Sequence, residues 1–291
     1  MAQTQDAQVL TRPKSNRAFG AIMVHAQPED RSTQRVKMAA RLAQDFDAAL
    51  IGVGAEFFEP VATVDPFGFA PVGEWLMAAQ DQVAADLKAA EKAFDRDAAG
   101  ARTEWRSVQE QPGRALTGMS RAADLIVAGG VAEGTVNRNS AADAADLVMT
   151  TGRPVLVVPA QGQALKGETI VIAWKDTRES RRAVADAMPF LARARDVVVA
   201  AVCSKGVEAM TRNSVRDVVE HLTRSGVKAR GMVVVEPKNS TTEEIRSVAN
   251  AAGADLIVAG AYGHSRFREW ALGGVTRDLL SEPAHYLLLS H

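Results

Sequence analysis

Short apolar runs rich in Val and Ile alternate along the chain with longer segments in which Ala, Leu, Arg and Glu recur at helical spacing. This alternation predicts parallel β-strands joined by α-helices. The strands expected in the second half are Thr169–Ala173, Asp196–Val202, Lys228–Val235, Asp255–Gly260 and Tyr286–Leu289. The helices expected between them are Arg178–Ala192, Val207–Ser225, Thr241–Ala252 and Trp270–Ser281. Because runs such as Val197–Val202 are apolar throughout, helices should cover both faces of the sheet.

The first half repeats this order of elements. Its expected strands are Ala21–Val24, Ala49–Val53, Thr103–Val108, Asp124–Gly129 and Val155–Val158. It differs by an extra segment, Glu56–Glu74, which is rich in Phe, Pro and Gly and follows the second strand. We interpret this segment as a surface excursion, with a lid over a neighbouring site as the alternative.

An internal repeat supports this reading. The hexapeptide Asp-Leu-Ile-Val-Ala-Gly occurs at Asp124–Gly129 and again at Asp255–Gly260, an offset of 260 − 129 = 131. The same offset aligns Val155–Val158 with Tyr286–Leu289. One structural unit has therefore been duplicated.

Length and composition fit two globular domains. A chain of 291 residues suits two domains of about 150 residues each. We expect a disordered polar tail at residues 1–17, one domain at 18–160 and a second at 167–291. A glycine-containing linker, Ala160–Gly167, separates the two domains.

Charge and cysteine content exclude several classes of partner. A formal net charge of −1 gives no general attraction to nucleic acid or to an anionic membrane. No apolar run reaches the roughly 20 residues of a membrane span, and the polar segment Met1–Arg17 lacks the core of a signal peptide. The single cysteine, Cys203, excludes an intrachain disulfide and suits a reducing compartment. We therefore expect a cytoplasmic protein.

The candidate chemistry lies after the fourth strand of the second half, where glycines recur. They are Gly260, Gly263, Gly273 and Gly274. Such a loop lets backbone N–H groups approach an anion, and a helix beginning beyond it would add a partial positive charge. In an open parallel sheet this is also the end of the strands at which ligands bind.

These residues carry a resemblance to a known family. The spacing Gly260-x2-Gly263-x9-Gly273, followed by Val-Thr-Arg-Asp-Leu-Leu, resembles the nucleotide loop of universal stress proteins, and Ile172–Ala183 is similar to their first strand and helix. The resemblance implies an α/β fold of two tandem Rossmann-like (adenine nucleotide alpha hydrolase-like) domains. Each domain would be a five-strand parallel sheet flanked by helices.

The resemblance also implies a site for an adenine nucleotide, such as ATP with Mg²⁺. The nucleotide-binding residues it implies are Ala173, Trp174, Lys175, Asp176, Gly260, Gly263, His264, Ser265, Arg266, Gly273, Gly274, Val275 and Thr276. Two of these depart from the family pattern. Gly274 stands where a Ser or Thr hydroxyl is common, and Lys175 stands where an acidic residue is common. Asp176, one place later, either replaces that acid or caps the following helix.

The first half lacks this loop chemistry. The offset of 131 places Ala132, Glu133, Ala142, Asp143 and Asp146 at the positions of Gly263, His264, Gly273, Gly274 and Arg277. Carboxylates at these positions would repel phosphate. We therefore expect a degenerate partner domain without a phosphate site.

No motif predicts rapid catalysis. The chain has no Gly-x4-Gly-Lys-Ser/Thr loop, its five histidines show no metal-ligand spacing, and Gly52-Val-Gly54 lacks the third glycine of a dinucleotide fingerprint. We expect a stress-response regulator that binds ATP or another adenine nucleotide in its second domain. The alternatives are a scaffold that acts through protein–protein contacts without nucleotide, and a slow ATP hydrolase. The resemblance implies that the two domains pair within the chain through their fifth strands, Val155–Val158 and Tyr286–Leu289, and it also allows a homodimer.

Overall fold

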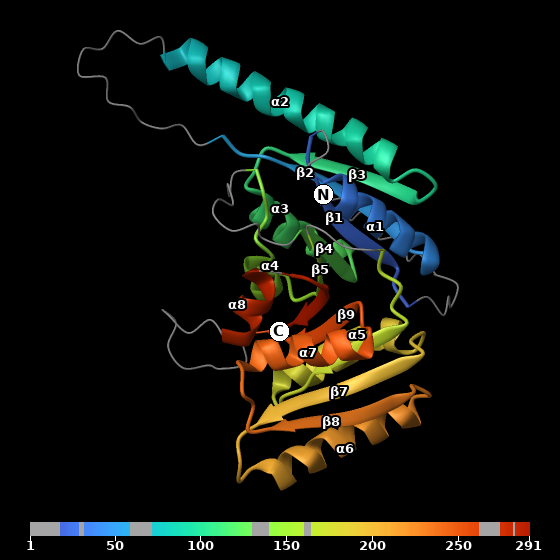
Figure 1. Cartoon of the computed structure of the whole chain (residues 1–291). Coiled ribbons are helices and arrows are strands. Elements are labelled where there is room, and N and C mark those ends of the chain that lie inside the picture. Colours follow the sequence, from blue (N-terminus) through green and yellow to red (C-terminus); the bar gives the residue numbers. More distant parts are fainter. Residues whose placement is uncertain are drawn as a thin grey trace, which may run out of the picture.

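The computed structural model describes residues 18–28, 32–58, 72–129, 140–159, 164–261, 274–281 and 283–291. They form one ten-stranded sheet with helices on both faces (Figure 1). The strands are β1 (Ala21–Ala26), β2 (Ala49–Ala55), β3 (Arg102–Val108), β4 (Leu125–Gly129), β5 (Val155–Val158), β6 (Thr169–Ala173), β7 (Asp196–Cys203), β8 (Ala229–Val235), β9 (Leu256–Gly260) and β10 (Tyr286–Ser290).

The two halves have the same topology. The strand order across the sheet is β3-β2-β1-β4-β5-β10-β9-β6-β7-β8, and all pairs within each half are parallel. In the first half Ile22 pairs with Leu50 and Leu125, and in the second Ile170 pairs with Val197 and Leu256. The prediction of two Rossmann-like units, each with five parallel strands, is therefore confirmed.

The halves join through their fifth strands, which are antiparallel. Leu156 pairs with Leu288, and Val157 pairs with Leu287. Shifting each residue by 131, up in β5 and down in β10, converts one of these pairs into the other. The junction therefore has a pseudo-twofold axis between the two pairs.

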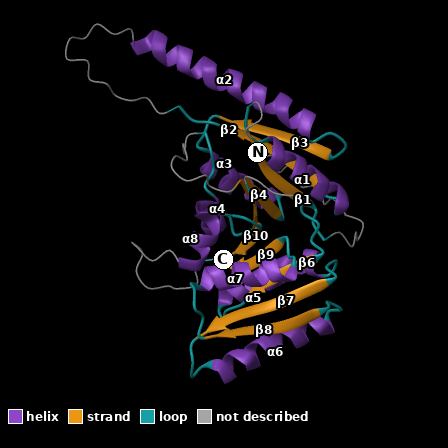
Figure 2. Cartoon of the chain, viewed as in Figure 1, coloured by secondary structure: helices purple, strands orange, loops and turns teal. Residues whose placement is uncertain are grey.

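Helices cover both faces of the sheet (Figure 2). They are α1 (Thr33–Asp45), α2 (Val72–Asp97), α3 (Pro112–Met119), α4 (Ala144–Thr150), α5 (Arg178–Leu191), α6 (Glu208–Arg224), α7 (Thr241–Ala252) and α8 (Gly274–Ser281), with a 3-10 turn η1 at Ser120–Ala122. Residues of α1, α2, α5 and α6 share one apolar core, and residues of α3, α4, α7 and α8 share the core on the other face. This arrangement explains why the central strands are apolar on both sides.

An aromatic cluster adds a second contact between the halves. The Phe190 ring of α5 lies 5.7 Å from Phe19 and 5.5 Å from Phe46, which belong to the first half. The guanidinium of Arg193, just beyond α5, covers the same Phe46 ring. The halves are thus packed by side chains on the α1 and α5 side as well as by backbone pairing.

Several boundaries refine the sequence predictions. The helix after the extra segment begins at Val72, so the predicted excursion overlaps it by three residues, and residues 59–71 lie outside the described part of the chain. The exposed N-terminal part of α2 extends beyond the sheet (Figure 1). The described part of the last predicted helix begins at Gly274. The predicted tail, residues 1–17, is also outside the described residues. Among those described, no helix is long and apolar enough to cross a membrane.

Candidate functional site

A cavity of about 390 Å³ lies at the carboxyl ends of β6 and β9. This volume is large enough for a small ligand. These adjacent strands lead to helices on opposite faces of the sheet, α5 and α8. The cavity therefore occupies the place where strand order reverses, which is the usual ligand site of open α/β sheets. It is lined by Ala173, Trp174, Lys175, Thr177, Ser180, Val202, Thr241, Ile245, Ala259, Gly260, Gly274, Val275 and Thr276.

The structure brings together most of the predicted binding residues that it describes. Seven of them line this one cavity: Ala173, Trp174, Lys175, Gly260, Gly274, Val275 and Thr276. The other predicted loop residues, Gly263, His264, Ser265, Arg266 and Gly273, lie outside the described residues. The segment Ala173–Lys175 thus meets Gly260 and Gly274–Thr276, which are remote in the sequence, at one end of the sheet.

Asp176 does not line this cavity. Its carboxylate accepts a hydrogen bond of 2.6 Å from Nη2 of Arg181, and both residues line a separate groove between α5 and α6. The suggestion that Asp176 caps the helix is wrong, because Thr177 is the N-cap and its Oγ1 accepts from the Ser180 N–H at 3.3 Å. Trp174 separates the cavity from the groove, and its Nε1 donates to Ser214 Oγ at 3.3 Å.

Three helix N-termini meet around the cavity. Thr177 precedes α5, Thr241 begins α7, and Gly274 begins α8. The unpaired N–H groups and partial positive charges of helix N-termini favour an anion. The first turn of α5 carries the buried Glu179. Burial alone would raise the pKa of the Glu179 carboxyl, but hydrogen bonds with its own backbone and Thr177 and the charge of Arg178 hold this pKa below its usual value. This carboxylate offsets part of the α5 dipole. The first turn of α7 carries Glu243 and Glu244, and Ser240 caps it, so α8, with no acid in its first turn, supplies the clearer attraction.

Gly260 allows α5 to approach the end of β9. A Cβ atom at this position would lie 2.5 Å from the Ser180 nitrogen and 2.6 Å from the Glu179 carbonyl carbon. Both are backbone atoms, so any side chain would push α5 away. The glycine at this position is therefore required by packing, whether or not a ligand binds.

Six lining residues were not predicted from the sequence. They are Thr177, Ser180, Val202, Thr241, Ile245 and Ala259. The hydroxyl residues stand at the starts of helices that follow strand ends, which is a recognisable signal. The apolar residues gave no such signal, because they resemble ordinary core positions.

In the first half, side chains occupy the corresponding place. Gly129 aligns with Gly260, and a Cβ on Gly129 would lie 2.7 Å from Nη1 of Arg35. Arg35 donates from Nε to the His25 carbonyl and from Nη2 to Gln27 Oε1, both at 3.0 Å. Gln27 in turn donates from Nε2 to the Ser140 carbonyl at 2.8 Å. Burial lowers the pKa of Arg35 to about 10. The Arg35 guanidinium thus occupies the space beside Gly129, and this hydrogen-bonded network takes the place of an open site.

A carboxylate also closes the helix N-terminus in the first half. Asp143 is the N-cap of α4, and its Oδ1 accepts from the Ala145 N–H at 2.8 Å. Asp146 adds a second acid to the first turn. Asp143 therefore takes the hydrogen-bonding place that a phosphate would need. Ala132 and Glu133 lie outside the described residues, whereas Ala142 lies just before the cap.

The lining of the second-half cavity suits an anion better than a metal ion. None of its described lining residues is Asp or Glu, and their oxygen ligands are hydroxyls and carbonyls. Across the described residues, no group of three His, Cys, Asp or Glu side chains could hold a metal. Because Mg²⁺ is commonly held by carboxylates together with substrate phosphates, a bound Mg²⁺ here would depend mainly on the nucleotide.

Comparison with protein-family models and with curated proteins finds no match. Solved structures do match. A universal stress protein from Archaeoglobus fulgidus is 10% identical with a TM-score of 0.65, covering 94% of this chain and 96% of its own. A protein from Pseudomonas aeruginosa UCBPP-PA14 assigned to the universal stress proteins is 15% identical with a TM-score of 0.62, covering 94% of each chain. The fold is thus that of universal stress proteins over nearly the whole chain.

Two further solved structures are similar to this chain. A protein of unknown function from Pseudomonas aeruginosa PAO1 is 15% identical, with a TM-score of 0.61 and coverage of 94% of this chain and 93% of its own. A universal stress protein in complex with cAMP is 25% identical over 50% of this chain and 99% of its own, with a TM-score of 0.36.

Proposed function

We propose that this chain is a universal stress protein of the tandem type, a cytoplasmic stress-response regulator that binds one adenine nucleotide per molecule. The site would be the cavity between β6 and β9, in a second domain spanning residues 167–291. The first domain, residues 18–160, would serve as a partner that has lost its own site. Binding would alter conformation or partner contacts, without rapid turnover.

The difference between the two halves carries the proposal. At the carboxyl ends of its strands, the second half has an open cavity of 390 Å³. In the first half, the Arg35–Gln27 network fills the corresponding place. A duplicated unit that needed no ligand would have no reason to keep this cavity open in one half after side chains had filled it in the other.

The chemistry of the cavity suits the two parts of a nucleotide. The apolar side chains of Val202 and Ile245 offer a surface for a base, and the start of α8 at Gly274 offers N–H groups to phosphate oxygens. Mg²⁺ would neutralise phosphate charge when bound. Thr276, which is buried in the first turn of α8, would add a hydroxyl.

Calorimetric titration of the full chain with ATP and Mg²⁺ tests the proposal. We expect one site per chain. The Gly274→Asp variant should weaken binding at least about tenfold, because the new carboxylate repels phosphate and competes for the same N–H groups. A Cβ at Gly274 meets no atom within 4 Å, so the substitution should leave the fold intact.

The matched control is Asp143→Gly at the corresponding position of the first half. It removes a carboxylate without opening the cavity, because the Arg35 network remains, so the stoichiometry should stay at one. Two sites per chain in the unmodified protein would contradict the proposal. A complete lack of nucleotide binding would favour the scaffold alternative.

A further inference from the structure

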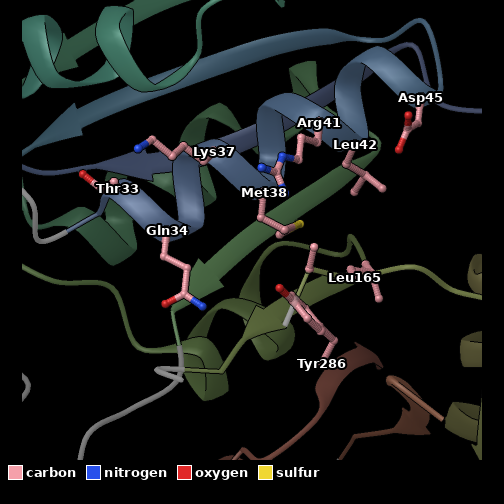
Figure 3. A pocket seen from close by; sticks show the side chains of 10 residues that line it. Thr33, Gln34, Lys37, Met38, Arg41, Leu42, Asp45, Leu165 and Tyr286 are labelled. Atoms are coloured by element: carbon pink, nitrogen blue, oxygen red, sulfur yellow. The ribbon is translucent and has the colours of Figure 1, made fainter. Parts of the chain in front are cut away.

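A second cavity, of about 340 Å³, lies at the junction of the two halves. Helix α1 forms one wall, and Leu165 and Tyr286 of the second half form the other (Figure 3). It lies on the α1 and α5 side of the sheet, next to the β5–β10 pairing, and is separate from the candidate nucleotide site.

The pseudo-twofold axis shows why this cavity exists. The burial pattern aligns α1 with α5 at an offset of 144, which places Phe46 at the position of Phe190. The buried residues Val36, Ala39, Ala40 and Ala43 then fall on the buried residues Ser180, Ala183, Val184 and Ala187. Before the first strand of each half, an aspartate accepts hydrogen bonds from two successive backbone N–H groups, and these bonds give a second alignment. Asp124 accepts from the N–H groups of Gly20 and Ala21, and Asp255 from those of Lys166 and Gly167.

This second alignment places Leu165 at the position of Phe19. Phe46 and Phe190 are counterparts that pack against each other, and Phe19 packs against both of them. On the other side of the axis the smaller Leu165 stands in the place of Phe19 and lines the cavity. The cavity is therefore the space that a ring at position 165 would fill.

The walls of this cavity combine an apolar interior with a basic rim. Met38 and Leu42 of α1 are buried and face Leu165 and the Tyr286 ring (Figure 3). Burial raises the pKa of Tyr286, so its hydroxyl stays neutral and the interior carries no charge from this residue.

Two cations stand on the rim. Lys37 Nζ lies 3.8 Å from Asp97 Oδ1, whereas Arg41 makes no ion pair or hydrogen bond with any residue that the structure describes. At the position of Arg41 in α5, the chain has Ala185, so Arg41 has no charged counterpart in α5. Asp45 lies at the other end, one turn beyond Arg41.

We propose that this junction cavity binds a small amphipathic carboxylate. Its apolar body lies between Met38, Leu42, Leu165 and the Tyr286 ring, and its carboxylate pairs with Arg41 at the rim. A ligand held there touches both halves at once and stabilises their packing. This inference does not depend on nucleotide binding at the other site.

Calorimetric titration with hexanoate, hexanol and hexylammonium tests the proposal, because these probes share one apolar chain and differ in charge. We expect hexanoate to bind with a Kd of about 1 mM or below, and the other two at least about fivefold more weakly. Arg41→Gln should weaken hexanoate at least about fivefold. Leu165→Phe, which places in this cavity the ring found across the axis, should abolish binding.

The matched control is Arg182→Gln, which removes an arginine of α5 that does not line this cavity. This variant should bind hexanoate as the unmodified protein does. Failure of hexanoate to bind at about 10 mM would overturn the proposal. Equal binding of hexylammonium or hexanol, or unchanged affinity in Arg41→Gln, would also overturn it.

Discussion

The guanidinium of Arg193 lies 3.9 Å from the centre of the Phe46 ring, across the boundary between the two halves. Arg193 Nη2 also donates to the Asp45 carbonyl at 2.8 Å. One side chain thus ties the end of α5 to the end of α1. It covers the outer side of the aromatic cluster that packs the halves together.

Replacing Arg193 with Ala should lower the free energy of unfolding by about 1 kcal/mol, because a cation–π contact and a charged hydrogen bond are lost. Denaturant-induced unfolding followed by circular dichroism measures this loss. Arg195→Ala is the control, since Arg195 pairs with the exposed Glu168 at 3.4 Å and exposed ion pairs contribute little. Equal losses in both variants would show that the contact with Phe46 contributes nothing specific.

The two aligned glycines should respond differently to Ala. Gly260→Ala would place a methyl group within 2.6 Å of the α5 backbone, and overpacking of this kind costs about 1–3 kcal/mol or more. Gly129→Ala meets the end of the Arg35 side chain at 2.7 Å, which can rotate away. Chemical denaturation of both variants should therefore show the larger loss for Gly260→Ala. The reverse order would mean that Arg35 is held more rigidly than the α5 backbone.

Asp143 should stabilise the first half as a helix cap. Asp143→Ala removes the acceptor for the Ala145 N–H and should cost about 1 kcal/mol, measured as a shift in the denaturation midpoint. Asp143→Asn keeps a side-chain acceptor and should cost much less. If the two variants lose the same stability, the charge of Asp143 matters more than its hydrogen bond.

His25 should make folding sensitive to acid. It is 3% exposed, and burial, followed by the charge of Arg35, lowers its pKa to about 3, although a hydrogen bond with the Ala55 carbonyl opposes the shift. The unfolded chain binds a proton near pH 6.5, whereas the folded chain does so only near pH 3. This contribution to stability is therefore complete above pH 6.5 and is lost as the pH falls toward 3, by at most about 1.4 kcal/mol per pH unit.

The measurement is the free energy of unfolding between pH 4 and 7 for the unmodified protein and for His25→Gln. The variant has no imidazole to protonate, so its stability should fall less steeply with decreasing pH. The comparison of slopes cancels the contribution of carboxylates such as Asp97, whose pKa is lowered mainly by its hydrogen bond with Arg96. Parallel curves would show that His25 titrates normally in the folded chain.

The sequence was sufficient to predict the order of the elements. Both hexapeptide copies form the fourth strand of a half, and the offset of 131 between them also relates the two strands that pair at the centre. Such predictions succeed because apolar periodicity and caps act locally. Ser240, for example, forms a capping box with Glu243, whose side chain accepts from the Ser240 N–H at 2.9 Å.

Features that depend on distant side chains could not be predicted in this way. Arg35 looks like an ordinary polar residue of an amphipathic helix, yet its guanidinium reaches Gln27 and fills the first-half site. Asp176 looked like a ligand or a cap, and it pairs with Arg181. The sequence gives the residue types at these places, but the direction of a long side chain depends on neighbours that are remote in the chain.

The pairing of β5 with β10 also limits how copies of this chain can associate. Both fifth strands are paired on both sides within one molecule, so the outer edges of the continuous sheet are β3 and β8. This chain therefore cannot form a homodimer through its fifth strands, because neither strand has an unpaired edge. Higher assembly would have to use helical surfaces, or extend the sheet end to end through its two outermost strands.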